Sequence, residues 1–172
     1  MAARHHNVSG EVTQELLAPG DNISVSKISL TNVQKVSKCK VDLYIEKKLT
    51  GKFYFLKGVE LPIGATLTYD GVNFNNAPDE FGLYIKLTDG ATFTLTGSIN
   101  VTGTNANVPG TNTLYTSELS VGDEILVDGE TRTIATITKY TTATVTANWG
   151  SDLDDDTTPD CNPKALVDVI ID

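Results

Sequence analysis

The histidines are the first side chains to test for chemistry, because imidazole is the most frequent general base in proteins. The chain has two of them, His5 and His6, which are adjacent in a polar N-terminal segment. A general base needs a third group to orient it and a pocket to tune its pKa, and a chain end offers neither. We therefore expect a solvated segment here, with adventitious metal capture as the alternative.

Known catalytic and nucleotide-binding patterns are missing from the sequence. It has no Gly-x-Ser-x-Gly elbow, no His-Glu-x-x-His zinc motif, no phosphate-binding loop and no dinucleotide fingerprint. The sequence therefore predicts a protein that is not an enzyme and that uses no cofactor.

An acidic run near the C-terminus comes closest to a metal site. Asp152, Asp154 and Asp156 stand at positions 1, 3 and 5 of a calcium-loop register and supply hard oxygens. Position 6 is Thr157, where such a loop needs Gly, and position 12 is Pro163, where it needs a bidentate Glu. We expect a solvated acidic loop, and the three carboxylates are weak candidates for a looser cation site.

Two tyrosines are the candidates for an interaction surface. Tyr54 and Tyr84 have the opposite parity to the apolar residues of their predicted strands, so their rings should point to solvent. Tyr is enriched at protein interfaces, and its ring can also stack on a sugar. The sequence predicts Tyr54 and Tyr84 as interface residues, with ordinary surface tyrosines or a sugar platform as alternatives.

The two cysteines, Cys39 and Cys161, stand far apart in the chain. A structural metal site needs four ligands at short spacing, so no metal framework is expected. An unsecreted chain matures in a reducing compartment, so we expect both thiols to stay reduced, with a disulfide between them as the alternative.

The charge balance narrows the range of partners. The 172 residues include 13 Lys and Arg and 22 Asp and Glu, a net charge of −9. Without a basic run, the chain is not expected to bind nucleic acid or an anionic membrane surface. No apolar run approaches the ~18 residues of a membrane span, and the first residues lack an apolar signal-peptide core. We therefore expect neither a membrane span nor a secretion signal.

Alternation of apolar and polar residues dominates the sequence, as within 40–46, and predicts β-strands. Asp-Gly pairs that begin at Asp70, Asp89 and Asp128 predict hairpin turns between such runs. Only Thr13–Ala18 suggests a short helix. The expected strands are 23–31, 40–47, 52–60, 65–70, 81–88, 91–96, 98–103, 113–116, 124–128, 131–138, 142–148 and 165–171.

Short, evenly spaced strands are typical of antiparallel sandwiches and barrels, so the predicted fold class is all-β. A segment rich in small residues, Gly103–Gly110, reads as a hinge between two modules. The predicted organisation is an N-terminal arm (1–20), an immunoglobulin-like or jelly-roll-like β-sandwich (21–97), a small SH3-like or OB-like β-barrel (98–150), and an acidic loop with a closing strand (151–172). The sequence leaves open which module that strand completes.

The segment with the most specific sequence is Gly97–Ala147, GSINVTGTNANVPGTNTLYTSELSVGDEILVDGETRTIATITKYTTATVTA. It resembles a small β-barrel module of tail, fibre and other virion proteins of tailed bacteriophages. The matching positions are Val108, Gly110, Thr111, Thr113, Tyr115, Thr116, Leu119, Val121, Gly122, Asp123 and Ile125, followed by the Asp128-Gly129 hairpin and by Arg132, Ile134 and Ile137. Pro109 departs from the pattern, where Thr or Ser is expected.

The preceding module is similar, more loosely, to accessory β-sandwiches of phage virion proteins. The similarity rests on the sequences of residues 23–32, 41–45, 53–59 and 61–67. The same order of strand and hairpin also occurs in immunoglobulin-like folds.

The resemblance implies a structural protein of a phage virion, assembled in the host cytoplasm. We expect a capsid decoration (cement) protein that binds the head shell, with a neck, tail or baseplate adaptor as the alternative. A carbohydrate-binding module for host recognition is an alternative of another class. The expected partners are the major capsid protein or other virion proteins, together with further copies of the chain in a homo-oligomer.

Overall fold

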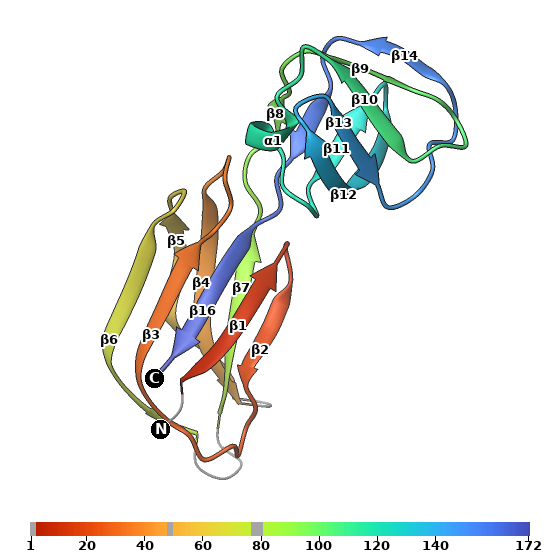
Figure 1. Ribbon diagram of the computed structural model, residues 1–172. Coiled ribbons are helices and arrows are strands. Elements are labelled where there is room, and N and C mark those ends of the chain that lie inside the picture. The colour runs from red at the N-terminus through yellow and green to blue at the C-terminus, as the bar shows by residue number, and fades with distance from the viewer. Residues whose placement is uncertain (1–2, 48–49, 77–80) are drawn as a thin grey trace. The chain divides into compact units, whose positions relative to one another are not determined.

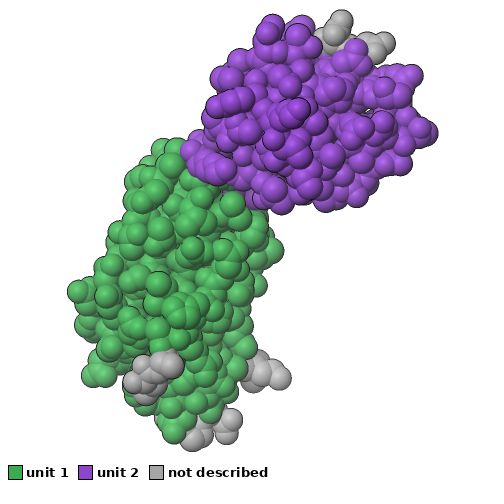
Figure 2. Space-filling view, in the orientation of Figure 1, with its two compact units in different colours: residues 1–34, 38–89, 165–172 green, residues 35–37, 90–164 purple. Residues whose placement is uncertain are grey.

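The computed structural model is all-β with antiparallel sheets, and it describes residues 3–47, 50–76 and 81–172. The chain divides into two compact units (Figure 2). Unit 1 is residues 1–34, 38–89 and 165–172, and unit 2 is residues 35–37 and 90–164. In the described part of the chain, no helix has the length and apolar character that crossing a membrane requires.

Unit 1 is a sandwich-like pair of antiparallel sheets (Figure 1). Its strands are β1 (Arg4–Ser9), β2 (Thr13–Leu17), β3 (Ser24–Asn32), β4 (Cys39–Lys47), β5 (Gly51–Leu61), β6 (Thr66–Asn75), β7 (Gly82–Thr88) and β16 (Leu166–Ile171). One sheet has the order β1-β16-β3-β6, and the other has the order β2-β7-β4-β5.

The alternation in the sequence is what places the core of unit 1 between these sheets. On β7, Leu83, Ile85 and Leu87 are fully buried, whereas Lys86 and Thr88 point to solvent. Successive side chains of a strand point to opposite faces, so one face of β7 is apolar throughout. Burying each of these side chains contributes about 1.5–3 kcal/mol.

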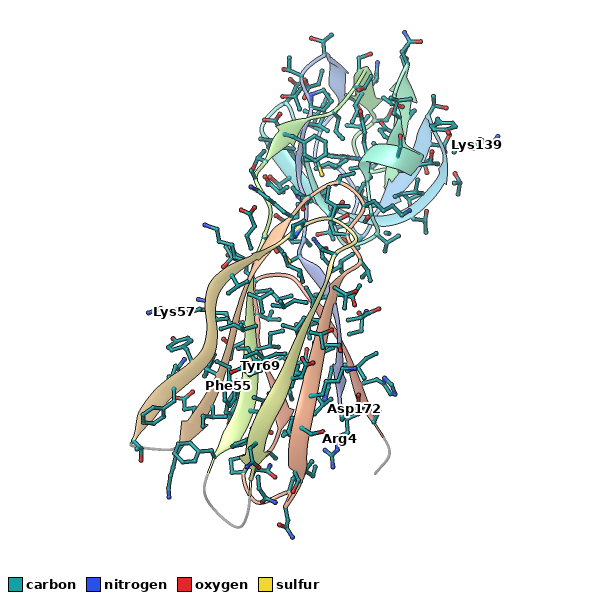
Figure 3. All side chains as sticks on the ribbon, turned by 90° about the vertical axis from the view of Figure 1, so that its left-hand side faces the viewer. Arg4, Phe55, Lys57, Tyr69, Lys139 and Asp172 are labelled. Carbon is teal, nitrogen blue, oxygen red and sulfur yellow. The ribbon has the colours of Figure 1, made fainter. Side chains whose placement is uncertain are left out.

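Aromatic side chains pack between the two sheets where β5 and β6 meet. These two strands follow each other in the chain but lie in opposite sheets. The Phe55 ring lies 5.9 Å from the Tyr69 ring and 6.3 Å from the Phe74 ring. Figure 3 labels Phe55 and Tyr69 on the sandwich and shows Lys57, on the same strand as Phe55, reaching outward.

The last strand of the chain completes the sandwich. β16 lies between β1 and β3, with Val169 opposite Leu30 on one side and Val167 opposite Val8 on the other. All four side chains are buried. Residues 90–164 of unit 2 are therefore an insertion between β7 and β16. The last strand completes unit 1, which answers the question that the sequence left open.

The expectation of a separate N-terminal arm at residues 1–20 is wrong for the described part of that segment. β1 pairs with β16 from Arg4 to Ser9, and Val8 is fully buried in the core. Long-range pairing of this kind leaves no local trace in a polar sequence, which is why the sequence predicted an arm here.

The short helix suggested by Thr13–Ala18 is also wrong, because these residues contain strand β2, which pairs with β7. A register shift between Glu15 and Leu17 lets both Leu16 and Leu17 turn toward the core. Such a β-bulge interrupts the alternation from which a strand is predicted.

Unit 2 forms one antiparallel sheet around its own core. Its elements are β8 (Phe93–Thr94), β9 (Ser98–Val101), β10 (Asn107–Thr111), α1 (Tyr115–Glu118), β11 (Glu124–Val127), β12 (Glu130–Lys139), β13 (Thr142–Val145), β14 (Leu153–Asp156) and β15 (Asp160–Asn162). The strand order is β14-β9-β10-β13-β12-β11-β15-β8. This order has two ends, β14 and β8, and the SH3-like or OB-like barrel stays a prediction.

The expected domain boundaries need correction at both ends of unit 2. The sandwich does not extend over 21–97, because it stops at Asp89, and the second module extends over 90–164 instead of 98–150. The reason is the pairing of β8 with β15, in which Phe93 lies opposite Cys161. The segment 151–172 is therefore divided between the two units.

The segment Gly103–Gly110 is not the hinge that its composition suggested. Its second half belongs to β10, which pairs with β9 and β13 and buries Val108 completely. A Cβ at Gly110 would fall 2.6 Å from the Tyr115 hydroxyl oxygen, so glycine permits a close approach there. The strand expected at 113–116 is also wrong, because Tyr115–Glu118 form the single turn α1.

Candidate interaction surface

A row of three tyrosines crosses the outer face of the sheet β2-β7-β4-β5. Tyr44 on β4 stands opposite Tyr54 on β5 and opposite Tyr84 on β7. The Tyr44 and Tyr54 rings are 5.3 Å apart and tilted by 48°, and the Tyr44 and Tyr84 rings are 5.7 Å apart and nearly parallel. Cross-strand aromatic pairs of this kind stabilise a sheet by about 0.2–1 kcal/mol each.

Two lysines cover the faces of these rings. The Lys52 ammonium lies 4.5 Å from the centre of the Tyr44 ring, and the Lys57 ammonium lies 5.0 Å from that of Tyr54. Both are cation–π contacts. Lys52 also donates a hydrogen bond to the Tyr44 hydroxyl at 3.2 Å, and this bond raises the pKa of Lys52.

A carboxylate at the other end of the row fixes the third ring. Tyr84 donates its hydroxyl hydrogen to Glu15 Oε2 at 2.9 Å, a contact between β7 and β2. Partial burial, and then this bond to Glu15, raises the pKa of Tyr84 to about 12. Tyr84 therefore stays protonated at physiological pH and keeps donating to the carboxylate. We call Tyr44, Tyr54, Tyr84, Lys52 and Lys57 the tyrosine surface.

The two predicted interface residues differ in exposure. Tyr54 is 42% exposed, Tyr84 is half-buried, and Tyr44 between them is buried. Phe53, next to Tyr54, is 52% exposed and packs edge-on against Phe81 at 5.9 Å. The sequence placed both tyrosines on the outer face, whereas their use in binding stays a prediction.

The aspartates of the acidic run accept hydrogen bonds from the backbone. Asp152 Oδ1 accepts the Gly103 amide at 2.7 Å, and Asp156 accepts the amides of Asp128 and Thr158 at 2.9 and 2.8 Å. The side chain of Asp154 lies outside the described residues. Among those described, no group of three or more His, Cys, Asp or Glu is placed to hold a metal ion.

The two histidines lie on β1 with different surroundings. His5 points to solvent, whereas His6 is half-buried and its Nε2 has no hydrogen-bond partner within the described residues. Burial, and then the positive charge of Arg4, lowers the pKa of His6. The expectation that both are solvated is therefore wrong for His6, because β1 is part of the sandwich.

A buried carboxylate beside a buried thiol is the feature of unit 2 that the sequence analysis missed. Asp123 is fully buried, and its Oδ2 lies 4.0 Å from the Cys161 sulfur. The carboxylate also accepts the backbone amides of Ser120 at 2.7 Å and Lys164 at 2.9 Å. Asp123 therefore holds the turn before β11 to the segment that follows β15, which is a structural task.

Both thiols are reduced and buried, and each belongs to a different core. Burial raises the pKa of Cys39 to about 11, and the carboxylate of Asp89 contributes in the same direction. Burial, followed by the nearby carboxylate of Asp123, also raises the pKa of Cys161. Neither sulfur has the lowered pKa of a nucleophilic cysteine.

Comparisons with family models, with curated proteins and with solved structures found no match to this chain.

The tyrosine surface is the arrangement with the clearest capacity to bind. Tyr and Lys on a sheet offer apolar area, hydroxyl groups and positive charge to a partner. The lysines could not be assigned to it from the sequence, because a β-bulge on β5 shifts the register between Leu56 and Tyr54.

Proposed function

We propose that this chain is a structural protein of a tailed-bacteriophage virion, and that it works as a capsid decoration protein by binding the major capsid protein. The observation that favours a binding role is the tyrosine surface, where the Tyr54 ring stays exposed on the outer face of a sheet. Exposed aromatic residues of this kind act as anchors in protein interfaces. A binding role instead of a catalytic one is part of the proposal.

The resemblance of Gly97–Ala147 to phage virion modules supports the same proposal. The matching positions Tyr115, Leu119 and Ile125 are fully buried in the core of unit 2, and Asp123 holds its turn. The similarity therefore rests on residues that build the unit. It argues for a shared building block of virion proteins and not for a shared binding site.

The geometry of the rings favours a protein partner over a sugar. A sugar stacks on an open aromatic face, but Lys52 lies over Tyr44 and Lys57 lies over Tyr54. A sugar would have to displace these cation–π contacts, which contribute about 0.5–1 kcal/mol each at exposed sites. A protein with acidic groups can instead pair with the same ammonium groups.

Quantitative mass spectrometry of purified particles, produced from the genome that encodes this chain, tests the proposal. Hundreds of copies per particle are expected for a protein that decorates the shell. Tens of copies or fewer would assign the chain to the neck, tail or baseplate and overturn the decoration role. Absence from washed particles would overturn the virion assignment altogether.

A matched pair of variants tests the tyrosine surface in the same particles. Tyr54→Ser should reduce incorporation, because it removes an exposed anchor. Tyr140→Ser is the control, because Tyr140 of unit 2 is 58% exposed and lies outside this surface. Equal incorporation of both variants would show that the tyrosine surface does not bind the shell.

A further inference from the structure

Strands β1 and β2 form one open flank of the sandwich of unit 1. In the described part of the chain, β1 is the outermost strand of one sheet and β2 is the outermost strand of the other. They lie on the side of unit 1 away from β5 and β6 (Figure 1). β1 is therefore held by β16 alone, and a strand with a single neighbour opens locally at a lower free energy than a central strand does.

His6 lies on the inner side of this edge strand. Residues of β1 alternate between two faces, so His6 shares its face with the fully buried Val8, whereas His5 and Asn7 point to solvent. Nε2 of His6 is shielded from solvent and has no hydrogen-bond partner within the described residues. In the neutral ring this nitrogen can be the one without a hydrogen, but in the protonated ring it is a charged donor without an acceptor, which is unfavourable when buried.

The groups around the His6 ring do not compensate for a positive charge. Burial lowers the pKa of His6, the charges of Arg4 and His5 act in the same direction, and a hydrogen bond with the backbone of Leu16 opposes them without reversing the shift. Val169, which stands opposite His6 on β16, is apolar. The carboxylates of the surrounding segments have other partners: Glu11 accepts the amide of Asp89, Glu15 binds Tyr84, Asp21 binds Arg4 and Asp168 binds Asn7.

We propose that His6 is a proton switch for this edge: when its imidazole ring binds a proton, β1 separates from β16 while the rest of the sandwich stays paired. In the open state the ring is in water and binds a proton at the ordinary pKa of about 6.5. Because the pKa is lowered in the closed state, protons bind the open state more tightly, and a fall in pH shifts the equilibrium toward it. The inference concerns the fold of unit 1 and stands independently of the proposed function.

The opening stays local because the strands around β1 have other partners. β16 keeps its pairing with β3, and β2 keeps its pairing with β7. Leu16 and Leu17 also hold β2 in the core, whereas Val8 is the one fully buried side chain among the six residues of β1. At neutral pH the burial of Val8 and the backbone ladder with β16 keep β1 closed.

Hydrogen exchange of the full chain, followed by mass spectrometry between pH 7 and pH 5, tests the switch. After correction for the intrinsic effect of pH on exchange, the protection of the β1 amides should fall by more than about two-fold and by less than about thirty-fold, the limit that a free imidazole with a pKa of about 6.5 sets. The amides of β4, a central strand of the other sheet, should keep their protection. Unchanged protection of β1, or an equal loss in β1 and β4, would overturn the inference.

A matched pair of variants assigns the effect to one ring. His6→Gln replaces the ring with an amide that takes up no proton in this pH range, and His5→Gln makes the same change on the solvent-facing side of β1. The loss of β1 protection toward pH 5 should disappear in His6→Gln and persist in His5→Gln. The opposite result, or a loss that persists in both variants, would show that His6 is not the switch.

A titration of the unaltered chain by nuclear magnetic resonance keeps the test independent of how the variants fold. The ring signals of His6 should titrate below the ordinary value of about 6.5, because the pKa of His6 is lowered. The amide signals of β1 should change with the same midpoint as the His6 ring. A midpoint of the β1 amides near pH 4, at about the value where carboxylates titrate, would refute the switch.

Discussion

Replacing Asp123 with alanine should unfold unit 2 at much lower denaturant concentrations. Its buried carboxylate accepts the backbone amides of Ser120 and Lys164, and Asp123→Ala leaves both donors without that acceptor. Hydrogen bonds to a charged group contribute about 1.5–3 kcal/mol each, so the loss should be about 3–6 kcal/mol. Stabilities of whole domains are about 5–15 kcal/mol, so this loss is a large part of the total.

The assay can use a single intrinsic probe. Trp149 is the only tryptophan of the chain, and it is buried in the core of unit 2, so its fluorescence reports the unfolding of that unit. Asp123→Asn keeps one acceptor oxygen, so about half of the loss is expected for that variant.

The neighbouring Glu124 provides the control. Glu124→Gln removes one negative charge next to Asp123, but the ion pair of Glu124 with Lys164 at 3.3 Å is partly exposed. Such pairs contribute about 0–1 kcal/mol. If Asp123→Ala lowers the free energy of unfolding by no more than Glu124→Gln does, the structural role of Asp123 is refuted.

Further outcomes are expected in unit 1 and at the two thiols. Deleting residues 1–12 removes β1 and the buried Val8, so the free energy of unfolding of unit 1 should fall by about 3 kcal/mol or more. Thermal unfolding followed by circular dichroism measures this loss, and an unchanged melting temperature would contradict the assignment of β1. Because the pKa of His6 is lowered in the folded chain, its contribution to stability is present above the ordinary imidazole value of about 6.5 and is lost as the pH falls below it. His6→Gln should flatten the melting temperature between about pH 7 and pH 5, whereas His5→Gln should not. Cys39 and Cys161 should react with a thiol reagent only at the rate of unfolding, because both are buried and burial raises the pKa of each. Fast reaction in the native chain would show that one of the two thiols is accessible.

The outer position of Tyr54 and Tyr84 could be predicted from parity alone, because side chains on a strand alternate between two faces. The position of Lys52 and Lys57 over the rings could not be predicted, because β5 is bulged between these lysines and no local pattern reveals a bulge. The carboxylate of Asp123 could be recognised as part of a Val-Gly-Asp turn in the sequence. Its bond to Lys164, which is 41 residues away, depends on tertiary packing.

The sequence by itself determined the class of structure. A strict period of two, as in Leu83, Ile85 and Leu87, can bury an apolar face only in a strand, and this physical requirement makes the chain all-β before any pairing is known. Asp-Gly pairs added hairpin turns because the tight turn needs residues that tolerate positive φ, and Asp128 and Gly129 have φ of 44° and 87°.

Only the tertiary structure decided which strands share a sheet. β1 and β16 stand at opposite ends of the chain, and β8 and β15 are more than sixty residues apart, yet each pair forms a ladder. Pairing partners are selected by the burial of both strands against a common core, and this free energy belongs to the assembled sheet and not to any segment of sequence. The place of the N-terminal segment and the insertion of unit 2 follow from these long-range pairings, and the tyrosine surface follows from the pairing of β4 with β5 and β7.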